Sequence, residues 1–282
     1  MERPILVTFG FPDTNSPRYR NLVKLYEQEG WDIRECLTEK KGFLAKCLDL
    51  KTQFNHVRNE YDAVLVNFPG YYLVPLAWWL TRRPRKPLYF DAFISISDTL
   101  VSDRKKVSWL NPVAWFYYLA DVISCHLPDT VLIDTEAHKR FFVSRFFLKP
   151  DSVRVVYVET RTDLFFPGPS KHLLKGDKFN VLFIGSYIPL QGIEHIVEAA
   201  RILRDETDIH FTLIGNGQTR QQIECQITEH QLQNITLLNF QPIETLPDYL
   251  RSCDVALGIF GTSQKADRVI PHKVYDAVAC GV

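Results

Sequence analysis

The sequence has no long hydrophobic run, no excess charge of either sign and no ordered set of cysteines. No apolar stretch approaches the roughly 20 residues of a membrane-spanning helix, which argues against an integral membrane protein. Lys plus Arg equal Asp plus Glu at 33 each, so we expect no nucleic-acid partner. The six cysteines show neither C-x-x-C pairs nor zinc spacing. We therefore expect no disulfide framework, no metal site and a reducing, cytoplasmic location.

What the sequence does contain is a regular alternation of strand and helix patterns. The 282 residues, 46% of them apolar, suffice for two domains of ordinary size. This rhythm is typical of doubly wound parallel sheets, so the predicted fold class is α/β, with two Rossmann-like domains facing a cleft. Short apolar runs predict strands at 5–8, 32–36, 63–67, 88–91, 131–134, 153–158, 180–184, 210–214, 235–238 and 255–258, with helices between most of them.

The pattern lapses once, in a stretch rich in proline, glycine and lysine. We predict an N-terminal domain at 1–165, a linker at 166–178 and a C-terminal domain at 179–282. The last helical pattern stops at Gly281, and the sequence ends at Val282, where another strand is due. We therefore expect the second domain to be truncated.

Two aromatic segments allow two interpretations. Residues 71–80 and 109–125 are rich in tryptophan and tyrosine, which suit a membrane–water interface. Aromatic side chains are also common in buried helices, and we favour packing in the core. Peripheral membrane association stays open as a second interpretation.

Two glycine turns follow predicted strands in the C-terminal half. Gly185 ends one strand and Gly192 opens the next helix, and a second turn reads Gly215-Asn216-Gly217. Glycine at the carboxyl end of a parallel strand lets the backbone approach a ligand, and the following helix offers its positive end to an anion. Tight turns alone would also explain these glycines. Together they indicate a nucleotide or sugar-phosphate site.

The sequence resembles glycosyltransferase family 4, whose members have the GT-B fold. The similarity is clearest from Val181 to Val282 and extends over nearly the whole chain. It rests on the segments FIGSYIPLQGIEHIVEAARIL, FTLIGNGQ, NITLLNFQPIETLPDYLRSCDVALGIF and RVIPHKVYDAVACG. The resemblance implies retaining transfer of a sugar from a nucleotide-diphosphate donor to a glycan or a lipid-linked acceptor. It implies no metal or other cofactor, and the sequence has no D-x-D pair.

Within the family's donor motif, Arg268 and Lys273 flank Pro271-His272 and are the candidates for stabilising the departing diphosphate. Arg268 stands where the family usually has a glutamate, a departure that removes an acceptor and adds a cation. A solvated surface position is the alternative for both residues. Asp276 stands where the family usually has a glutamate that holds the donor ribose, and aspartate is one methylene shorter. Ser186 and Gln191 replace the arginine and lysine that commonly contact the diphosphate. Either Arg268 and Lys273 supply the missing charge, or activity is lost.

On the N-terminal side, the segment 91–106 follows a predicted strand and would face the acceptor. Asp98, Asp103 and Arg104 are the candidate acceptor residues, and an exposed polar loop is the alternative. Arg18 could reach a phosphate, although we expect it on a solvated helix face.

Three hypotheses follow. The first is a retaining glycosyltransferase that binds a nucleotide sugar through its C-terminal domain. The second is a non-catalytic nucleotide-sugar-binding protein or an inactive fragment of such an enzyme. The third, which we do not favour, is another GT-B enzyme, such as an epimerase or a phosphorylase.

Overall fold

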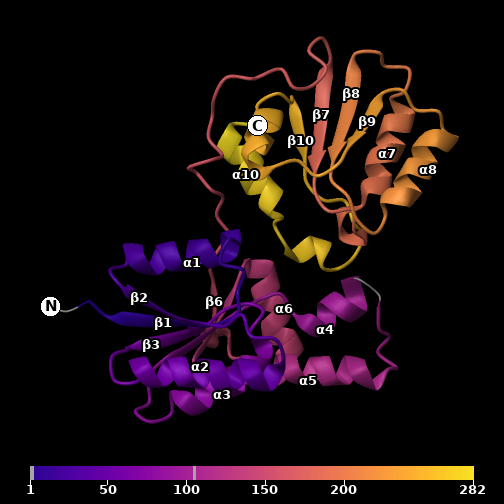
Figure 1. Ribbon diagram of the computed structural model, residues 1–282. Coiled ribbons are helices and arrows are strands. Elements are labelled where there is room, and N and C mark those ends of the chain that lie inside the picture. The colour runs from indigo at the N-terminus through magenta and orange to yellow at the C-terminus, as the bar shows by residue number, and fades with distance from the viewer. Residues whose placement is uncertain (1–2, 104–105) are drawn as a thin grey trace. The chain divides into compact units, whose positions relative to one another are not determined.

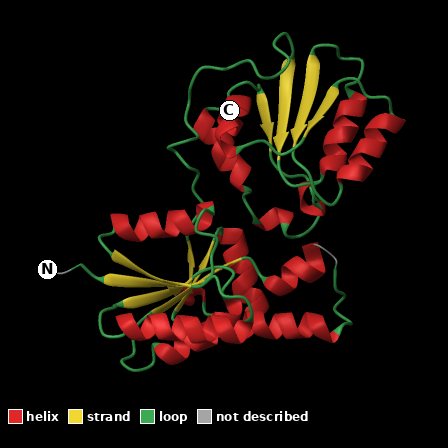
Figure 2. Ribbon diagram, in the orientation of Figure 1, coloured by secondary structure: helices red, strands yellow, loops and turns green. Residues whose placement is uncertain are grey.

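The computed structural model describes residues 3–103 and 106–282, and for residues 102 and 103 it describes the backbone alone. The chain divides into two compact units, Met1–Val158 and Glu159–Val282. Each unit is built on its own parallel sheet with helices beside it (Figures 1 and 2). The α/β fold class predicted from the sequence is confirmed.

The N-terminal unit has a six-stranded parallel sheet with the order β2-β1-β3-β4-β5-β6. Its strands are β1 (Ile5–Gly10), β2 (Asp32–Leu37), β3 (Ala63–Val66), β4 (Leu88–Phe93), β5 (Thr130–Ile133) and β6 (Val153–Val155). Its helices are α1 (Pro17–Gln28), α2 (Phe43–Val57), α3 (Val74–Leu80), α4 (Ile96–Asp98), α5 (Pro112–His126) and α6 (Glu136–Phe146), with the shorter η1 (Tyr71–Leu73), η2 (Thr99–Asp103) and η3 (Pro150–Ser152).

This sheet is buried on both faces, as parallel sheets require. Along β1, Leu6 packs with Leu22 of α1, whereas Val7 belongs to the cluster on the opposite face. That larger cluster includes Phe54 of α2 and Ala77 of α3. Figure 1 shows α1 on one side of the sheet and α2, α3 and α5 on the other. The alternation of side chains along the strands therefore sorts the helices into two layers.

The C-terminal unit has a four-stranded parallel sheet with the order β10-β7-β8-β9. Its strands are β7 (Phe179–Ile184), β8 (Ile209–Ile214), β9 (Ile235–Leu238) and β10 (Val255–Leu257). Its helices are α7 (Ile193–Ile202), α8 (Arg220–Glu229), α9 (Leu246–Leu250) and α10 (His272–Cys280), with the shorter η4 (Pro189–Gln191), η5 (Ile243–Thr245) and η6 (Ala266–Arg268). One core holds Ile196 of α7 and Ile223 of α8, and the other holds Ala277 of α10.

Local sequence signals explain most of the element ends. The Ser16 hydroxyl accepts a hydrogen bond from the Tyr19 N–H, and Pro17 occupies the first turn of α1. Thr135 caps α6 through the His138 N–H in the same way. Gly281 ends α10 in the left-handed conformation, with φ of +85°. Each predicted strand corresponds to one of β1–β10 in the described part of the chain.

One predicted domain boundary and one alternative interpretation differ from the structure. The segment from Glu159 onward belongs to the second unit, although 159–165 was predicted in the first domain. The reason is that Phe165 is buried against Leu182 and Leu250 of the C-terminal core. The acceptor segment is also no polar loop over 96–103, because α4 and η2 make it helical.

The two aromatic segments are buried only in part. Tyr71 and Ala77 are buried in the core, as packing requires. Trp79 is nevertheless 54% exposed, and Trp115 and Phe116 of α5 are 58% and 60% exposed. These helices therefore bury one side and present aromatic side chains on the other.

Candidate functional site

The order of the C-terminal strands creates a switch point between β7 and β10. From β7 the chain proceeds outward to β8 and β9, and it then returns to place β10 on the opposite side of β7. α7 and α10 belong to the two different cores of this unit, so the loops after β7 and β10 leave the sheet in opposite directions. This is the arrangement that frames the ligand crevice of open α/β sheets. Ligands of open α/β sheets bind in such crevices.

The glycines of the two turns bring the loops at this edge into backbone contact. A Cβ atom on Gly215, at φ +142°, would collide with the carbonyl oxygen of Gly185. A Cβ atom on Gly217 would lie 2.9 Å from the backbone N and O of Tyr187. Gly192, at φ +62°, meets the backbone of Phe260 in the same way. These three positions therefore require glycine, because a Cβ atom at any of them would overlap the backbone of a neighbouring loop.

Gly185 has a different neighbourhood, made of side chains. A Cβ atom at this position would lie 2.8 Å from Lys273 Nζ and 3.3 Å from Gln191 Oε1. Lys273 Nζ donates hydrogen bonds to Gln191 Oε1 at 2.5 Å and to the Gly258 carbonyl oxygen at 3.3 Å. Three candidates from the sequence, Gly185, Gln191 and Lys273, thus meet at the ends of β7 and β10.

The ammonium group of Lys273 is unusual because no described carboxylate balances its charge. Its acceptors are neutral oxygens, and its Nζ lies 3.7 Å from the centre of the Phe183 ring. Among the described residues, no carboxylate lies within ion-pair distance of this group. Burial lowers the pKa of Lys273 to about 7. A buried cation without a counter-ion is suited to receive an anionic ligand.

Asp276, one turn further along α10, is already engaged. Its Oδ1 accepts a hydrogen bond from the Thr160 hydroxyl, and its Oδ2 lies 3.1 Å from His272 Nδ1. His272 Nε2 donates to the Glu159 carbonyl oxygen at 3.0 Å. Burial alone would lower the pKa of His272, but the hydrogen bond and charge of Asp276 raise it. This network ties the segment at 159–160 to α10.

The remaining candidates of this unit lie in the same loops. Ser186 is exposed beside Gly185. Asn216 is exposed, and its side-chain oxygen accepts a hydrogen bond from the Gly217 N–H at 2.7 Å. Arg268 ends η6 and is half-buried, and its N–H donates to the Lys265 carbonyl oxygen at 3.0 Å. Contact of its guanidinium with a ligand stays a prediction.

Sequence reasoning missed one residue at this edge, Arg220. Its Nη1 donates to the carbonyl oxygens of Gly215 and Leu238 at 3.0 and 3.3 Å, which joins the ends of β8 and β9. Its guanidinium carbon also lies 5.2 Å from the centre of the Tyr187 ring, and its Nε donates to Glu224 at 2.6 Å. An arginine three residues after a glycine turn was the only signal, and it is a weak one.

In the N-terminal unit, Asp121 organises the segment that contains Asp98. The Asp121 carboxylate accepts hydrogen bonds from the Ser95 hydroxyl at 2.7 Å and from the Ser97 hydroxyl and N–H at 2.7 and 2.9 Å. Burial raises the pKa of Asp121, and these hydrogen bonds oppose the shift. Asp98 is 6% exposed, so it is no solvated loop residue. The side chain of Asp103, and Arg104 as a whole, lie outside the described residues.

A buried ion pair between Arg18 and Asp91 corrects the expectation for Arg18. Its Nη2 lies 2.8 Å from Asp91 Oδ1, and both side chains are almost fully buried. Its Nη1 also donates to the Val156 carbonyl oxygen. Arg18 was expected on a solvated face of α1, but this face packs on the sheet and Asp91 supplies the counter-charge.

Two searches of the described residues gave no candidates. No group of three His, Cys, Asp or Glu side chains is placed so that it could hold a metal ion. No helix in the described part of the chain combines the length and the apolar character needed to cross a membrane.

Known proteins resemble this chain both in sequence and in fold. Residues 168–282 match the family model described as glycosyl transferases group 1. A 108-residue stretch is 32% identical to the putative colanic acid biosynthesis glycosyl transferase WcaI of Escherichia coli K12. That match spans 38% of this chain and 26% of WcaI.

The solved structures that resemble this chain are GT-B glycosyltransferases with two Rossmann-like domains, and the chain has this fold. HepE from Anabaena, in complex with UDP and glucose, matches with a TM-score of 0.65 at 16% identity, over 99% of this chain and 79% of HepE. Sucrose-phosphate synthase from Thermosynechococcus elongatus matches with a TM-score of 0.67 at 15% identity, over 90% and 75% of the two chains. The lipopolysaccharide outer core galactosyltransferase WaaB matches with a TM-score of 0.63 at 11% identity, over 99% and 79%.

Proposed function

We propose that the protein is a retaining glycosyltransferase of the family 4 type that binds a nucleotide-diphosphate sugar at the carboxyl ends of β7 and β10. The observation that carries the proposal is Lys273, a cation that pairs with no carboxylate in the described part of the chain and lies beside Gly185 at the switch point of the sheet. The family-model match over this unit supports the same assignment. Because HepE was crystallised with UDP and with UDP-glucose, a UDP-hexose is the first donor to test.

Lys273 would act on the leaving group. Cleavage of the bond between the anomeric carbon and the diphosphate oxygen places negative charge on that oxygen, and a preorganised cation stabilises this charge. Gly185 has no side chain that would keep the phosphate from Lys273 Nζ. We propose that Arg268 adds a second charge and that Ser186 and Asn216 donate neutral hydrogen bonds. In this proposal, protein groups replace a divalent metal, and treatment with EDTA should leave turnover unchanged.

The structure of the N-terminal unit favours a lipid-linked acceptor over a free glycan. An apolar groove of about 460 Å³ lies between the start of α2, η1 with α3, and α5. Tyr72 and Phe116 stack across it with ring centres 6.2 Å apart. The groove begins where α2 and η1 follow the carboxyl ends of β2 and β3, which is the edge that binds ligands in such sheets.

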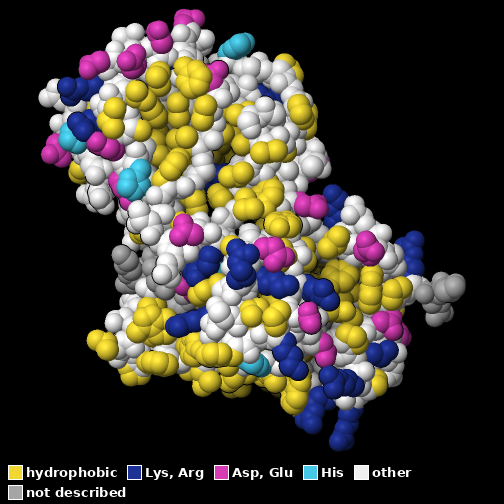
Figure 3. Space-filling model, turned by 180° about the vertical axis from the view of Figure 1, so that it is seen from behind, with side chains coloured by type: hydrophobic (Ala, Val, Ile, Leu, Met, Phe, Trp, Pro, Cys, Tyr) yellow, Lys and Arg dark blue, Asp and Glu magenta, His cyan; other side chains and the backbone are white. Residues whose placement is uncertain are grey.

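Exposed apolar side chains beside this groove support peripheral association with a membrane. On the face shown in Figure 3, hydrophobic side chains gather along the lower edge of the N-terminal unit. Aromatic side chains that are half-exposed on a helix suit the membrane–water interface. The exposed large apolar residues of α5 and of the segment just before it are Leu110, Val113, Trp115, Phe116, Leu119 and Ile123.

Binding and turnover must be measured separately. Calorimetry with a panel of UDP-, GDP- and ADP-sugars identifies the donor, and a coupled assay for nucleotide-diphosphate release measures turnover with lipid-linked and soluble acceptors. Release that requires both donor and acceptor supports a transferase. Tight donor binding without any release would instead support the second hypothesis, a non-catalytic nucleotide-sugar-binding protein, for which the neutral Ser186 and Gln191 argue. Absence of binding for the whole panel would refute the proposed site.

A further inference from the structure

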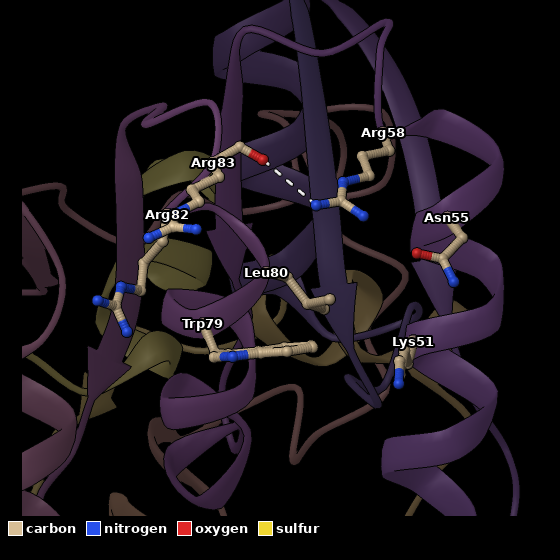
Figure 4. Close-up of a pocket in the computed structure, with 7 residues that line it drawn as sticks. All are labelled: Lys51, Asn55, Arg58, Trp79, Leu80, Arg82 and Arg83. Atoms are coloured by element: carbon tan, nitrogen blue, oxygen red, sulfur yellow. Dashed lines mark hydrogen bonds between the residues drawn. The ribbon is translucent and has the colours of Figure 1, made fainter.

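A second cavity, of about 550 Å³, lies in the N-terminal unit between α2 and the end of α3. Its volume falls within the roughly 300–1,000 Å³ typical of small-molecule sites. In Figure 4, Trp79 and Leu80 lie between the α2 side chains on one side and two arginines on the other. The residues that line it are Lys51, Asn55, Arg58, Trp79, Leu80, Arg82 and Arg83.

The position of this basic pocket separates it from the ligand-binding edge of its sheet. Arg58 ends α2 just before β3 begins, and Arg82 and Arg83 precede β4. These residues therefore lie at the amino ends of the strands. Acceptors and donors bind at the carboxyl ends in open α/β sheets. The basic pocket is thus no part of the site proposed above, and its function does not depend on that proposal.

The charge of the basic pocket is the main argument for a ligand. The whole chain has equal numbers of basic and acidic residues, yet four cations and no carboxylate line this cavity. Asp49 and Glu60 each stand two positions from a pocket cation in the sequence, but neither lines the cavity. Asp62 pairs with Lys86 instead, and Asp129 pairs with Arg85. Clustered like charges focus a positive field that attracts an anion. A bound anion would also relieve the mutual repulsion of the four cations.

The geometry favours an anion with several acceptor oxygens. Arg58 Nη2 donates to the Arg83 carbonyl oxygen at 3.4 Å, and this bond holds the end of α2 beside the loop after α3. Guanidinium groups present planar sets of N–H donors that match phosphate oxygens, and two arginines with a lysine can surround one phosphate. Asn55 adds an uncharged donor on the same side as Lys51 (Figure 4).

Tryptophan rings lie beside the cations of the basic pocket. Lys51 Nζ lies 5.5 Å from the centre of the Trp79 ring, and the Arg82 guanidinium lies 4.6 Å from that of Trp78. Both tryptophans are also partly exposed, at 54% and 37%. Tryptophan beside clustered Lys and Arg is typical of surfaces that contact anionic phospholipids.

We propose that the basic pocket of Lys51, Arg58, Arg82 and Arg83 binds the phosphate group of a phosphate ester. Two sources share this chemistry, a phospholipid headgroup and a soluble phosphate ester, and the experiment distinguishes them. The full chain is titrated with vesicles of phosphatidylcholine alone, with vesicles that also contain phosphatidylglycerol, and with soluble glycerol phosphate. Sedimentation measures binding to vesicles, and calorimetry measures binding of glycerol phosphate.

The test variant is the double substitution Arg58→Gln with Arg83→Gln. Its matched control is Arg34→Gln with Arg154→Gln, which removes the same charge from exposed positions on β2 and β6 of the same unit. We expect the pocket variant to bind at least ten-fold more weakly and the control to bind within two-fold of the wild type. Lys51→Gln, an exposed single change, repeats the test if the double variant does not fold.

Selective loss from phosphatidylglycerol vesicles assigns a lipid headgroup, and selective loss of glycerol phosphate binding assigns a soluble ester. Both results support the pocket. Equal losses in the two double variants would show general charge attraction and overturn the proposal. It is likewise overturned if the wild type binds neither probe.

Discussion

Lys273 Nζ donates a hydrogen bond to Gln191 Oε1 at 2.5 Å, across 82 positions of sequence. This contact joins the first turn of α10 to the loop after β7. The neutral oxygen of Gln191 accepts one N–H of Lys273 but does not balance its charge. The predictions for the donor site follow from this pair.

Lys273→Met is expected to separate stability from function. Removing a cation that burial disfavours should raise the melting temperature of the ligand-free protein, because methionine fills similar volume without a desolvation cost. The same change should lower turnover by roughly ten- to a thousand-fold, the scale for loss of one transition-state charge contact. Differential scanning fluorimetry and the release assay measure the two effects.

Arg268→Ala should lower turnover on the same scale as Lys273→Met. Normal rates in both variants would contradict the site assignment.

Donor binding should take up a proton above neutral pH. The pKa of Lys273 is lowered to about 7, so above that pH the amine is largely neutral in the ligand-free protein. A bound diphosphate favours the charged form and raises this pKa again. Affinity should therefore fall as pH rises from 7 to 9. Calorimetry in buffers of different ionisation enthalpy measures the proton uptake, which Lys273→Met should abolish.

Substitutions of Gln191 should act in opposite directions. Gln191→Lys places a second cation beside Lys273, which should lower the melting temperature without ligand and strengthen diphosphate binding. Gln191→Glu gives Lys273 a counter-ion, which should raise the melting temperature and weaken diphosphate binding. Thermal shifts with and without UDP test both variants. Equal responses to UDP would show that this loop does not contact the donor phosphates.

Gly215→Ala is expected to destabilise the C-terminal unit. Its φ of +142° is strained for any residue with a side chain, and the added methyl would meet the Gly185 carbonyl oxygen. We expect a loss of roughly 2 kcal/mol or more in the free energy of unfolding. Gly176→Ala is the control, because nothing lies within 4 Å of a Cβ atom there. Urea denaturation of both variants checks the difference.

The His272–Asp276 pair should stabilise the C-terminal unit at acidic pH. Since the pKa of His272 is raised above 6.5 in the folded state, its contribution is complete below 6.5 and is lost as pH rises through the raised value. The melting temperature of His272→Gln should therefore fall furthest below that of the wild type near pH 6. Above pH 8 the difference should be smaller. A difference that grows with pH would mean that the pair is not charged.

The elements of both sheets could be predicted from the sequence because their signals are local. Apolar runs between turn residues located each of β1–β10. The caps that the structure shows at Ser16 and Thr135 are local as well, because each side chain bonds an N–H three residues further on. Gly185, Gln191 and Lys273 were also named as candidates before any contact was known. Arg220 was not, because its partners Gly215 and Leu238 lie at the ends of two different strands, Gly215 just after β8 and Leu238 in β9.

By itself, then, the sequence determined the α/β rhythm, the glycine turns and the cation at the start of the last helix, because periodicity and turn chemistry act over a few residues. Only the tertiary structure decided which groups become partners. It buried Arg18 against Asp91, engaged Asp276 with His272 and placed Lys273 against the neutral oxygen of Gln191. Such pairings depend on strand order and on the direction in which each loop leaves its sheet, and no local pattern encodes either.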